Sequence, residues 1–271
     1  MASEFGPSDA RGWIAIPGPA DDKYSRGVLG FVTGSPRYPG AAVLGVEAAL
    51  HAGVGMVRYL GTGRPTRLVL QRRPETVTAA GRVQAWVLGS GQDPADRDGL
   101  TGELLGRALA QTVPMVIDSG ALDRVQDAAG PVVITPHAGE LATLLGTTRA
   151  AIQDDPEGTA TRAAAELGVT VLLKGHRTVV ATPGGLKYTV TAPTTWLSTA
   201  GSGDALAGIL GALVATHQQK VLADPGVLAE LAATACVLHG RAGERASGGG
   251  PFTVLELCAR IPEVVAEILR G

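Results

Sequence analysis

The sequence predicts one doubly wound α/β domain, in which helices cover both faces of a mostly parallel sheet. Short apolar runs without polar alternation recur along the chain, as is typical of strands buried on both faces. Longer segments rich in Ala and Leu separate these runs, with apolar residues at spacings of three and four, which indicates helices packed against the sheet. Gly (38) and Pro (17) make up about a fifth of the 271 residues, above the usual share, which favours many tight loops.

The expected elements alternate along the chain. Apolar runs predict strands at residues 28–33, 85–88, 115–118, 132–135 and 169–173. Helical periodicity predicts helices between them, at residues 40–53, 101–111, 139–145 and 157–167. Two short runs at 178–181 and 187–190 flank Pro183-Gly184-Gly185, which indicates an antiparallel hairpin. The chain then turns helical at 204–217, 225–245 and 253–269, so that a group of helices closes the fold.

Composition and charge exclude several classes of protein. Hydrophobic residues make up 45% of the chain and charged residues 18%, which supplies enough apolar surface for a folded core. The net charge is −2 and no block of Lys or Arg occurs, so we expect no binding of nucleic acid. The longest apolar run, residues 205–215, is well short of the roughly 20 residues that a membrane span needs. There is no signal-peptide pattern, and Cys236 and Cys258 lack metal or redox spacing, so we expect buried thiols in a cytoplasmic protein.

Ligands of such folds bind beyond the carboxyl ends of the strands, so the chemistry is sought in the loops that lead into helices. The strongest candidate is Ala200-Gly201-Ser202-Gly203-Asp204, which runs into an apolar helix. Its glycines turn backbone N–H groups toward one point, where the helix N-terminus adds partial positive charge, so a phosphate or a developing oxyanion is expected there. Asp204 is placed to take a proton from a substrate hydroxyl. The alternative is an ordinary glycine turn in which Asp204 caps the helix.

Four further loops are weaker candidates. Residues 132–140 end a strand and start a helix, so His137 is either a ligand contact or a surface histidine. Residues 171–178 place Lys174 at a buried strand end, where it either binds nucleotide phosphates or reaches water. Residues 34–42 and 88–92 are glycine-rich loops without a GxGxxG pattern. No HExxH, GxSxG or Cys/His cluster occurs, so no metal ligand is identified among the side chains; magnesium held by nucleotide phosphates would leave little trace.

Taken in order, these loops resemble those of the ADP/ATP-dependent NAD(P)H-hydrate dehydratases, members of the ribokinase-like superfamily. The matching segments read GSxxYxGAAVL, GSG, VIDSGAL, VITPHAGEL, VLLKGxxT and AGSGDALAGIL. The likeness runs from Lys23 to the C-terminus and includes the HGRAGE segment that begins at His239. It implies a ribokinase-like three-layer α/β/α domain at residues 23–271, after an extension at residues 1–22 that we expect to be too short for the epimerase domain of some relatives.

The resemblance also implies a repair reaction. ADP or ATP drives the dehydration of hydrated NADH or NADPH (the S epimer) back to NAD(P)H, with Mg²⁺ beside the nucleotide and a homo-oligomer as the assembly. Asp204 matches the aspartate at the hydrated substrate, and Ala41, Gly91 and His137 match positions in the hydrated-cofactor pocket. The positions that match nucleotide contacts are Lys174, Gly175, His176, Arg177, Thr178 and Gly203. The amides of Gly201, Ser202 and Gly203 are expected to form an anion hole.

The chain departs from the family pattern beside this loop. Relatives commonly carry GGTGD, preceded by Asn-x-x-Gly-Met-Ala, where this chain has AGSGD after the segment TTWLST at residues 194–199. Two other functions therefore stay open. One is a small-molecule kinase of the same superfamily, which would make a stable phosphate ester of a vitamin precursor or a sugar-like alcohol. The other is a nucleotide sensor without turnover.

Overall fold

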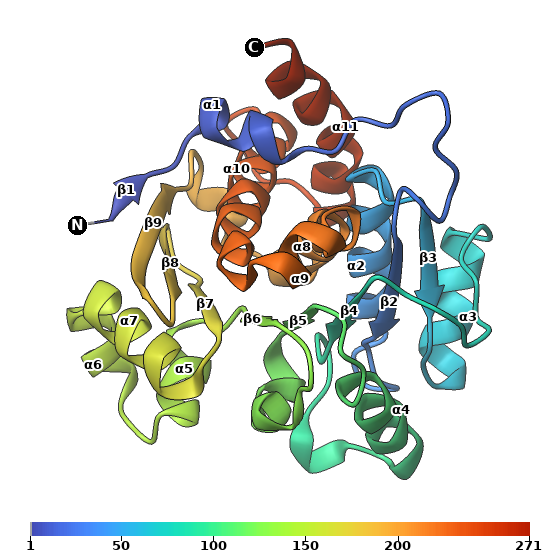
Figure 1. Ribbon diagram of the computed structural model, residues 1–271, viewed down its shortest axis with the longest axis horizontal. Helices are drawn as coiled ribbons and strands as arrows, with labels where there is room; N and C mark the ends of the chain where they lie inside the picture. The colour runs from blue at the N-terminus through green and yellow to red at the C-terminus, as the bar shows by residue number, and fades with distance from the viewer. Residues whose placement is uncertain (1) are drawn as a thin grey trace.

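A nine-stranded sheet runs through the molecule, with helices on both faces, in the computed structural model of residues 2–271 (Figure 1). Its strands lie in the order β1-β9-β8-β7-β6-β5-β4-β2-β3, and every neighbouring pair is parallel except β7–β8 and β8–β9. The strands are β1 (Ser3–Glu4), β2 (Val28–Val32), β3 (Met56–Tyr59), β4 (Ala85–Leu88), β5 (Met115–Ile117), β6 (Val132–Ile134), β7 (Thr170–Leu173), β8 (Arg177–Thr182) and β9 (Gly185–Thr191). The three-layer, mostly parallel α/β fold predicted from the sequence is confirmed.

Side chains of each central strand alternate between two hydrophobic cores, one on each face of the sheet. In β2, Leu29 and Phe31 point into the first core, whereas Val28 and Val32 point into the second. The strands are buried on both faces, which is why they appear in the sequence as unbroken apolar runs.

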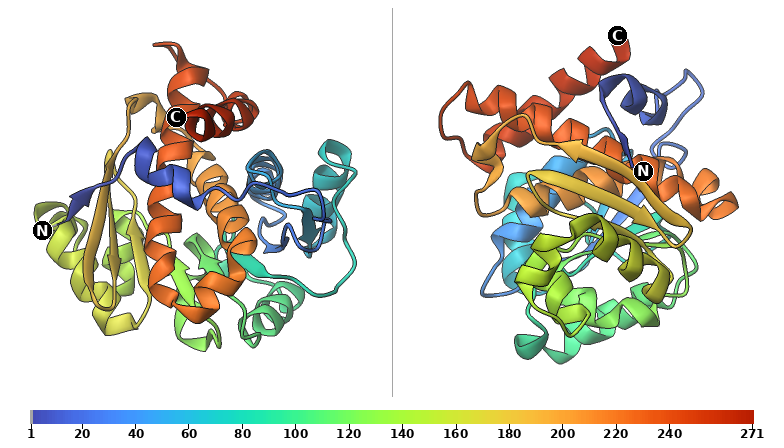
Figure 2. Two further views of the ribbon diagram at one scale, coloured as in Figure 1. Left: turned by 45° about the horizontal axis from the view of Figure 1, so that its top comes forward. Right: turned by 90° about the vertical axis from the view of Figure 1, so that its left-hand side faces the viewer.

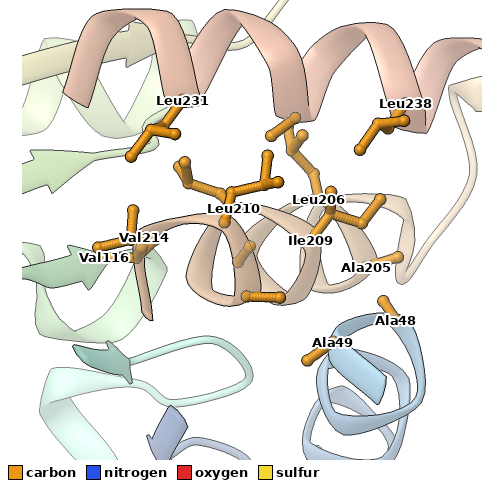
Figure 3. Packing of buried hydrophobic residues seen from close by; sticks show 14 of the residues in the cluster. Ala48, Ala49, Val116, Ala205, Leu206, Ile209, Leu210, Val214, Leu231 and Leu238 are labelled. Carbon is orange, nitrogen blue, oxygen red and sulfur yellow. The ribbon is translucent and has the colours of Figure 1, made fainter. Parts of the chain in front are cut away.

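Two groups of helices cover these faces. The first core is closed by α2 (Gly40–His51), α8 (Ser202–Thr216), α10 (Leu228–Ser247) and α11 (Val254–Arg270), with α3 (Gly63–Arg72) and α9 (Gln218–Ala223) at its margin. The second is closed by α4 (Gly99–Leu109), the 3-10 segment Ser119–Asp127, α5 (Ala138–Leu144), α6 (Arg149–Asp154) and α7 (Pro156–Leu167). Helix α8 lies between the sheet, α2 and α10, and its apolar side chains meet all three (Figure 3).

The N-terminal segment packs on the first face of the domain. Strand β1 pairs with β9, and the short helix α1 (Pro7–Ala10) lies across α10 (Figure 2). Phe5 is buried, with its ring 4.9 Å from the ring of Tyr188 in an edge-on contact. These contacts add an edge strand to the sheet within residues 1–22, which the sequence reading treats as an extension.

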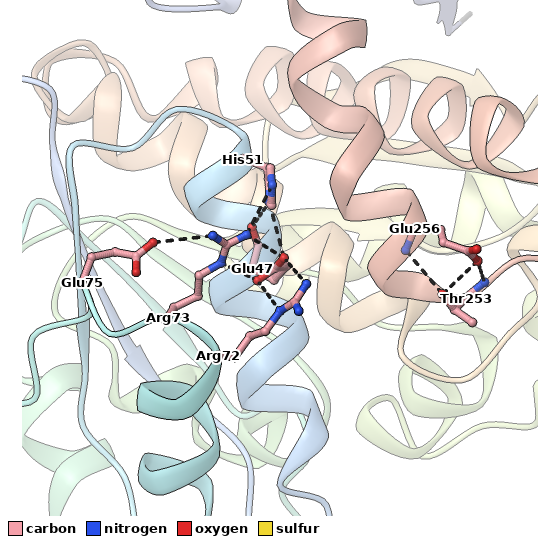
Figure 4. A network of polar contacts seen from close by, with 7 residues as sticks. All are labelled: Glu47, His51, Arg72, Arg73, Glu75, Thr253 and Glu256. Atoms are coloured by element: carbon pink, nitrogen blue, oxygen red, sulfur yellow. Dashed lines mark hydrogen bonds and ion pairs between the residues drawn. The ribbon is translucent and has the colours of Figure 1, made fainter.

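Helices α2 and α3 are joined by a buried carboxylate. Glu47 is almost fully buried and accepts hydrogen bonds from Arg72 at 2.9 Å and from Arg73 at 2.5 Å (Figure 4). The two guanidinium groups hold the pKa of Glu47 below its usual range, against a burial effect that alone would raise it. These ion pairs hold the C-terminal end of α3 against α2. The sequence patterns do not predict α3.

Helices α2 and α8 pack closely because glycine occurs on both. A Cβ atom at Gly208 would lie 2.2 Å from the carbonyl oxygen of Gly45.

We therefore expect Gly208→Ala to destabilise the fold by about 1–3 kcal/mol in urea unfolding, because the helices must separate. The matched control is Gly106→Ala inside α4, where a new Cβ atom meets nothing within 4 Å. That change should raise stability by roughly 0.5–1 kcal/mol through helix propensity. Equal responses of the two variants would contradict this view of the contact.

The structure also shows the state of the two cysteines and the character of the helices. Cys236 and Cys258 are free and buried, as predicted. Within residues 2–271, none of the helices combines the length and apolar character that crossing a membrane requires.

Candidate active site

Polar side chains from several strands gather at one edge of the sheet. Ser90 follows β4, Asp118 follows β5, and Thr135 follows β6, while Lys174 follows β7. These strands are parallel, so their carboxyl ends lie side by side. A backbone bridge between His137 and Lys174 extends the pairing of β6 and β7 past the regular strands.

Asp118 is the centre of this group. It is almost fully buried, and its carboxylate accepts hydrogen bonds from Lys174 Nζ at 2.9 Å, Thr135 Oγ1 at 2.8 Å and Ser90 Oγ at 2.9 Å. Burial alone would raise the pKa of Asp118, but the positive charge of Lys174 and these hydrogen bonds outweigh it and lower the pKa. Asp118 is therefore an anion that fixes three strand ends.

Lys174 lies between this anion and the start of α8. Its Nζ atom is also 3.7 Å from Glu140 Oε2, and a Cβ atom at Gly203 would lie 3.5 Å from the same Nζ atom. Burial alone would lower the pKa of Lys174, but the charges of Asp118 and Glu140 raise it. The ammonium group is thus a fixed cation against the first turn of α8.

Asp204 lies in that first turn. Gly201 precedes the helix with φ +90°, a conformation that favours glycine, and it reverses the chain so that the N–H groups of α8 begin at the sheet edge. Burial raises the pKa of Asp204 to about 7, and the negative charge of Asp118 adds to this, while Lys174 opposes it. A carboxylate whose pKa lies near neutrality is suited to accept a proton from a hydroxyl group during a reaction.

A cavity of about 500 Å³ opens beside these groups. It is lined by six of the predicted nucleotide or anion positions and by His137. The remaining wall comes from the end of β9, the segment at residues 192–199, α8 and α10. The predicted residues in the lining are Lys174, Gly175, His176, Thr178, Ser202, Gly203 and His137.

Arg177 is the predicted nucleotide contact that does not line this cavity. Its guanidinium forms an ion pair with Glu157 of α7, and the residue lines a neighbouring cavity of about 530 Å³. Side chains alternate along a strand, so Arg177 and Thr178 of β8 point to opposite faces.

Ala41 and Gly91 lie on two loops that touch each other. A Cβ atom at Gly91, where φ is +68°, would lie 2.3 Å from Ala41 Cβ. Ala41 is in the first turn of α2, one turn before Gly45, which approaches the backbone oxygen of Asp204. Neither residue lines the 500 Å³ cavity, so the predicted hydrated-cofactor positions are divided: His137 lines this cavity, whereas Ala41 and Gly91 do not.

His137 caps the N-terminus of α5. Its Nδ1 atom accepts a hydrogen bond from the amide of Glu140 at 3.0 Å, and Glu140 Oε2 accepts one from the amide of His137 at 2.7 Å. The side chain is 60% exposed and lines both the 500 Å³ and the 530 Å³ cavities. The helix-start placement is confirmed, while a ligand contact stays a prediction.

A larger cavity, of about 820 Å³, lies at the opposite edge of the sheet. Its walls include Val132 and Thr170, which begin β6 and β7, and the hairpin turn at Gly184. It contains none of the predicted site residues. The 500 Å³ cavity is the candidate active site because Lys174 and the glycine loop line it, and Asp204, the carboxylate of raised pKa, directly follows that loop.

Two residues near the site were not singled out by sequence reasoning. Asp118 is visible in the sequence only as a polar strand end, because its partner Lys174 lies 56 positions later. The general rule that parallel strand ends meet would have found it. His239 is buried against Ser202 although 37 positions separate them, and no local pattern marks this contact.

Metal binding by side chains alone is not supported in the part of the chain that the structure describes. Residues 2–271 contain no group of three or more His, Cys, Asp or Glu side chains that could hold an ion. The carboxylates of Asp118 and Glu140 are instead engaged with Lys174.

Comparison with known proteins places these features in a family. A family model described as NAD(P)H-hydrate dehydratase matches residues 29–256. A bifunctional NAD(P)H-hydrate repair enzyme Nnr of Mycobacterium tuberculosis (strain H37Rv) is 45% identical over 224 residues, which are 78% of this chain and 46% of the relative. The chain thus spans about half the length of such bifunctional relatives. An ADP-dependent (S)-NAD(P)H-hydrate dehydratase of Xanthomonas campestris is 31% identical over 282 residues, 94% of each chain.

Solved structures share the fold. An ADP/ATP-dependent NAD(P)H-hydrate dehydratase of Bacillus subtilis, co-crystallised with ATP/Mg²⁺, superposes with a TM-score of 0.86 at 23% identity, covering 98% of this chain and 99% of its own. A hydroxyethylthiazole kinase of Pyrococcus horikoshii superposes with a TM-score of 0.67 at 16% identity, covering 98% and 96% of the two chains. At such identities the likeness is one of architecture.

Proposed function

The chain belongs to the NAD(P)H-hydrate dehydratase family, and from this premise we propose that it is a lyase that returns hydrated NADH or NADPH to NAD(P)H at the expense of ADP or ATP. The S epimer is the proposed substrate, as in the name of the Xanthomonas relative. The observation that carries the proposal is Asp204, a half-buried carboxylate whose pKa is raised to about 7 and which directly follows Ser202 and Gly203 in the wall of the 500 Å³ cavity.

Asp204 supplies the base for the first step. Its carboxylate takes the proton of the ring hydroxyl, and the hydroxyl oxygen attacks the terminal phosphoryl group of the nucleotide, so that ATP leaves as ADP or ADP as AMP. The C–O bond then breaks with its electron pair leaving on phosphate, and a proton departs from the neighbouring ring carbon. The ring double bond is restored, because phosphate is a far better leaving group than hydroxide.

The start of α8 and Lys174 stabilise the charge that moves in this step. Of the three amides predicted to form an anion hole, that of Ser202 instead donates to the carbonyl oxygen of Thr199 at 3.3 Å. Gly201 and Gly203 supply the other amides at the start of α8, where an anion is favoured. The Lys174 ammonium is held beside Gly203 by Asp118. These donors are in place before the substrate binds, so little reorganisation is needed during the reaction.

Mg²⁺ is proposed as the ion that accompanies the nucleotide. The side-chain carboxylates of this edge fit an ion held mainly by phosphate oxygens, because Asp118 and Glu140 already pair with Lys174. When bound, Mg²⁺ would neutralise phosphate charge.

The direct test is incubation with chemically hydrated NADH and either ADP or ATP, following the return of the absorbance of reduced nicotinamide. Recovery of NADH that depends on nucleotide supports the proposal. A stable phosphate ester of an alcohol would instead show a kinase, and nucleotide binding without turnover of any substrate would show a sensor. Recovery with one nucleotide only would also settle the choice between ADP and ATP.

His137→Ala tests the assignment of the hydrated-cofactor side. We expect the KM for hydrated NAD(P)H to rise several-fold to tenfold, because one polar contact is worth about 0.5–1.5 kcal/mol, while nucleotide affinity stays nearly unchanged. The variant also loses the cap of α5, which costs about 1 kcal/mol of stability.

Thr148→Ala is the matched control, because Thr148 caps α6 with its side chain and lies outside the 500 Å³ cavity. It should lose similar stability without any change in KM. Loss of ADP binding in His137→Ala would mean that the two binding sides are reversed, and an unchanged KM would leave His137 as a helix cap only.

The assembly and location of the protein are proposed from the resemblance. We expect a cytoplasmic homo-oligomer, and light scattering of the purified chain checks its oligomeric state. Neither nucleic acid nor a membrane is a proposed partner; for nucleic acid, the net charge is −2 and the sequence has no block of Lys or Arg.

A further inference from the structure

A buried histidine holds the first residue of α8. His239 of α10 places its Nε2 atom 3.0 Å from the backbone oxygen of Ser202 and 3.1 Å from Ser202 Oγ. Both side chains are more than nine-tenths buried, and both line the 500 Å³ cavity. The contact resembles a serine–histidine pair, in which the ring would accept the serine proton.

The hydrogen-bond geometry instead requires a proton on Nε2 of His239. A backbone carbonyl oxygen can only accept, so the Nε2 atom that faces it must carry the hydrogen. The ring is neutral at physiological pH, since burial lowers the pKa of His239 to about 4. In this tautomer Nε2 has no lone pair to offer, so Ser202 Oγ accepts from the ring and does not donate to it.

The serine proton is then free for another acceptor. Within residues 2–271 no other hydrogen bond of the Ser202 hydroxyl is found, and the group lies in the cavity wall next to Gly203. A buried hydroxyl donor without a protein acceptor is costly unless a ligand supplies one.

We propose that the Ser202 hydroxyl donates a hydrogen bond to the terminal phosphate of the bound nucleotide, and that His239 is the positioning residue that reserves this hydroxyl as a donor. The inference rests on the proposed function, which supplies the nucleotide. It assigns the serine of AGSGD a role beyond its backbone amide, and it excludes Ser202 as a nucleophile activated by His239.

Calorimetry with ATP, ADP and AMP separates this role from a structural one. Ser202→Ala should weaken ATP and ADP binding about tenfold or more, because a hydrogen bond to a charged phosphate is lost. AMP, which lacks the terminal phosphate, should bind with unchanged affinity. Ser202→Thr keeps the hydroxyl and should bind all three nucleotides nearly as the parent chain does.

The role of His239 is tested through the same serine. His239→Leu removes the N–H donor and should weaken ATP binding without affecting AMP, whereas His239→Gln keeps an N–H and should recover most of the ATP affinity. In a Ser202→Ala background, His239→Leu should cause little further loss for ATP, because the hydroxyl through which it acts is already absent.

The outcomes are distinct. Equal weakening of ATP and AMP, or full additivity of the two substitutions, overturns the inference and makes the contact structural. Unchanged ATP affinity in the soluble, folded Ser202→Ala variant overturns it as well, even if His239→Leu does not fold. If the parent chain binds none of the three nucleotides, the proposed function fails, and the inference fails with it.

Discussion

Asp204→Asn is expected to lower turnover of hydrated NAD(P)H by roughly 10²–10⁴-fold while the fold and nucleotide binding are retained. Asparagine has nearly the same shape and still completes the first turn of α8, but it cannot take a proton from the ring hydroxyl. Steady-state kinetics and calorimetry on the same preparation measure the two properties.

Asp98→Asn is the control for this substitution. Asp98 caps α4, a helix on the other face of the sheet, and asparagine is an equally good cap. Its turnover should equal that of the parent chain. Near-normal turnover in Asp204→Asn would remove the base assignment and leave Asp204 as a residue that complements the helix dipole.

Asp204→Asn should also change how the stability of the fold depends on pH. The pKa of Asp204 is raised in the folded state from 3.8 to about 7, so the unfolded chain releases this proton at lower pH than the folded one. Stability is therefore unaffected by this group below about pH 4, falls as the pH rises toward 7, and stays reduced above it. Asp204→Asn should match the parent in urea near pH 4 and exceed it by roughly 1–4 kcal/mol at pH 8.

The activity of the parent chain should rise with pH, whereas the contribution of Asp204 to stability falls. The free enzyme needs ionised Asp204, so kcat/KM should rise with pH and level off above about 7. A stability gain of the variant at pH 8 without a rise of activity near pH 7 would place the raised pKa on a group that is not the base.

The sequence predicts the sheet better than its edges for a physical reason. Strands buried on both faces must be apolar at every position, so β2, β4, β5, β6 and β7 appear directly as apolar runs. Strand β3 is not predicted because Arg58 interrupts the apolar run of its four residues. Strand β1 is not predicted because it has only Ser3 and Glu4, whose pairing with β9 depends on tertiary contacts.

The residues of the site also differ in whether the sequence predicts them. Glycine loops at helix starts are local features, so the Ala200–Asp204 segment and Lys174 are predicted from sequence alone and are brought together by the fold. The partners that set their chemistry are distant in sequence: Asp118 beside Lys174, and His239 beside Ser202. The raised pKa of Asp204 likewise depends on burial, which a single motif does not specify.

Asp118→Ala is expected to be the most destabilising substitution at the site, by about 3–5 kcal/mol in urea unfolding, because it leaves the Lys174 ammonium, whose side chain is only 19% exposed, without its main partner. Ser90 and Thr135 lose their acceptor too. Asp96→Ala breaks the ion pair with Arg37, in which both side chains are more than half exposed, and should cost less than about 1 kcal/mol. Similar losses in the two variants would contradict the central role of Asp118.

A paired substitution separates charge from packing in this network. Replacing both partners, as Asp118→Leu with Lys174→Met, should destabilise less than Asp118→Ala alone, because no uncompensated charge stays buried. The double variant should still lose nucleotide affinity, since Lys174 is then absent from the anion site beside Gly203. If the double variant instead binds ADP as the parent does, Lys174 serves only to satisfy Asp118. In that case the amides at the start of α8 hold the phosphates without a cation from β7.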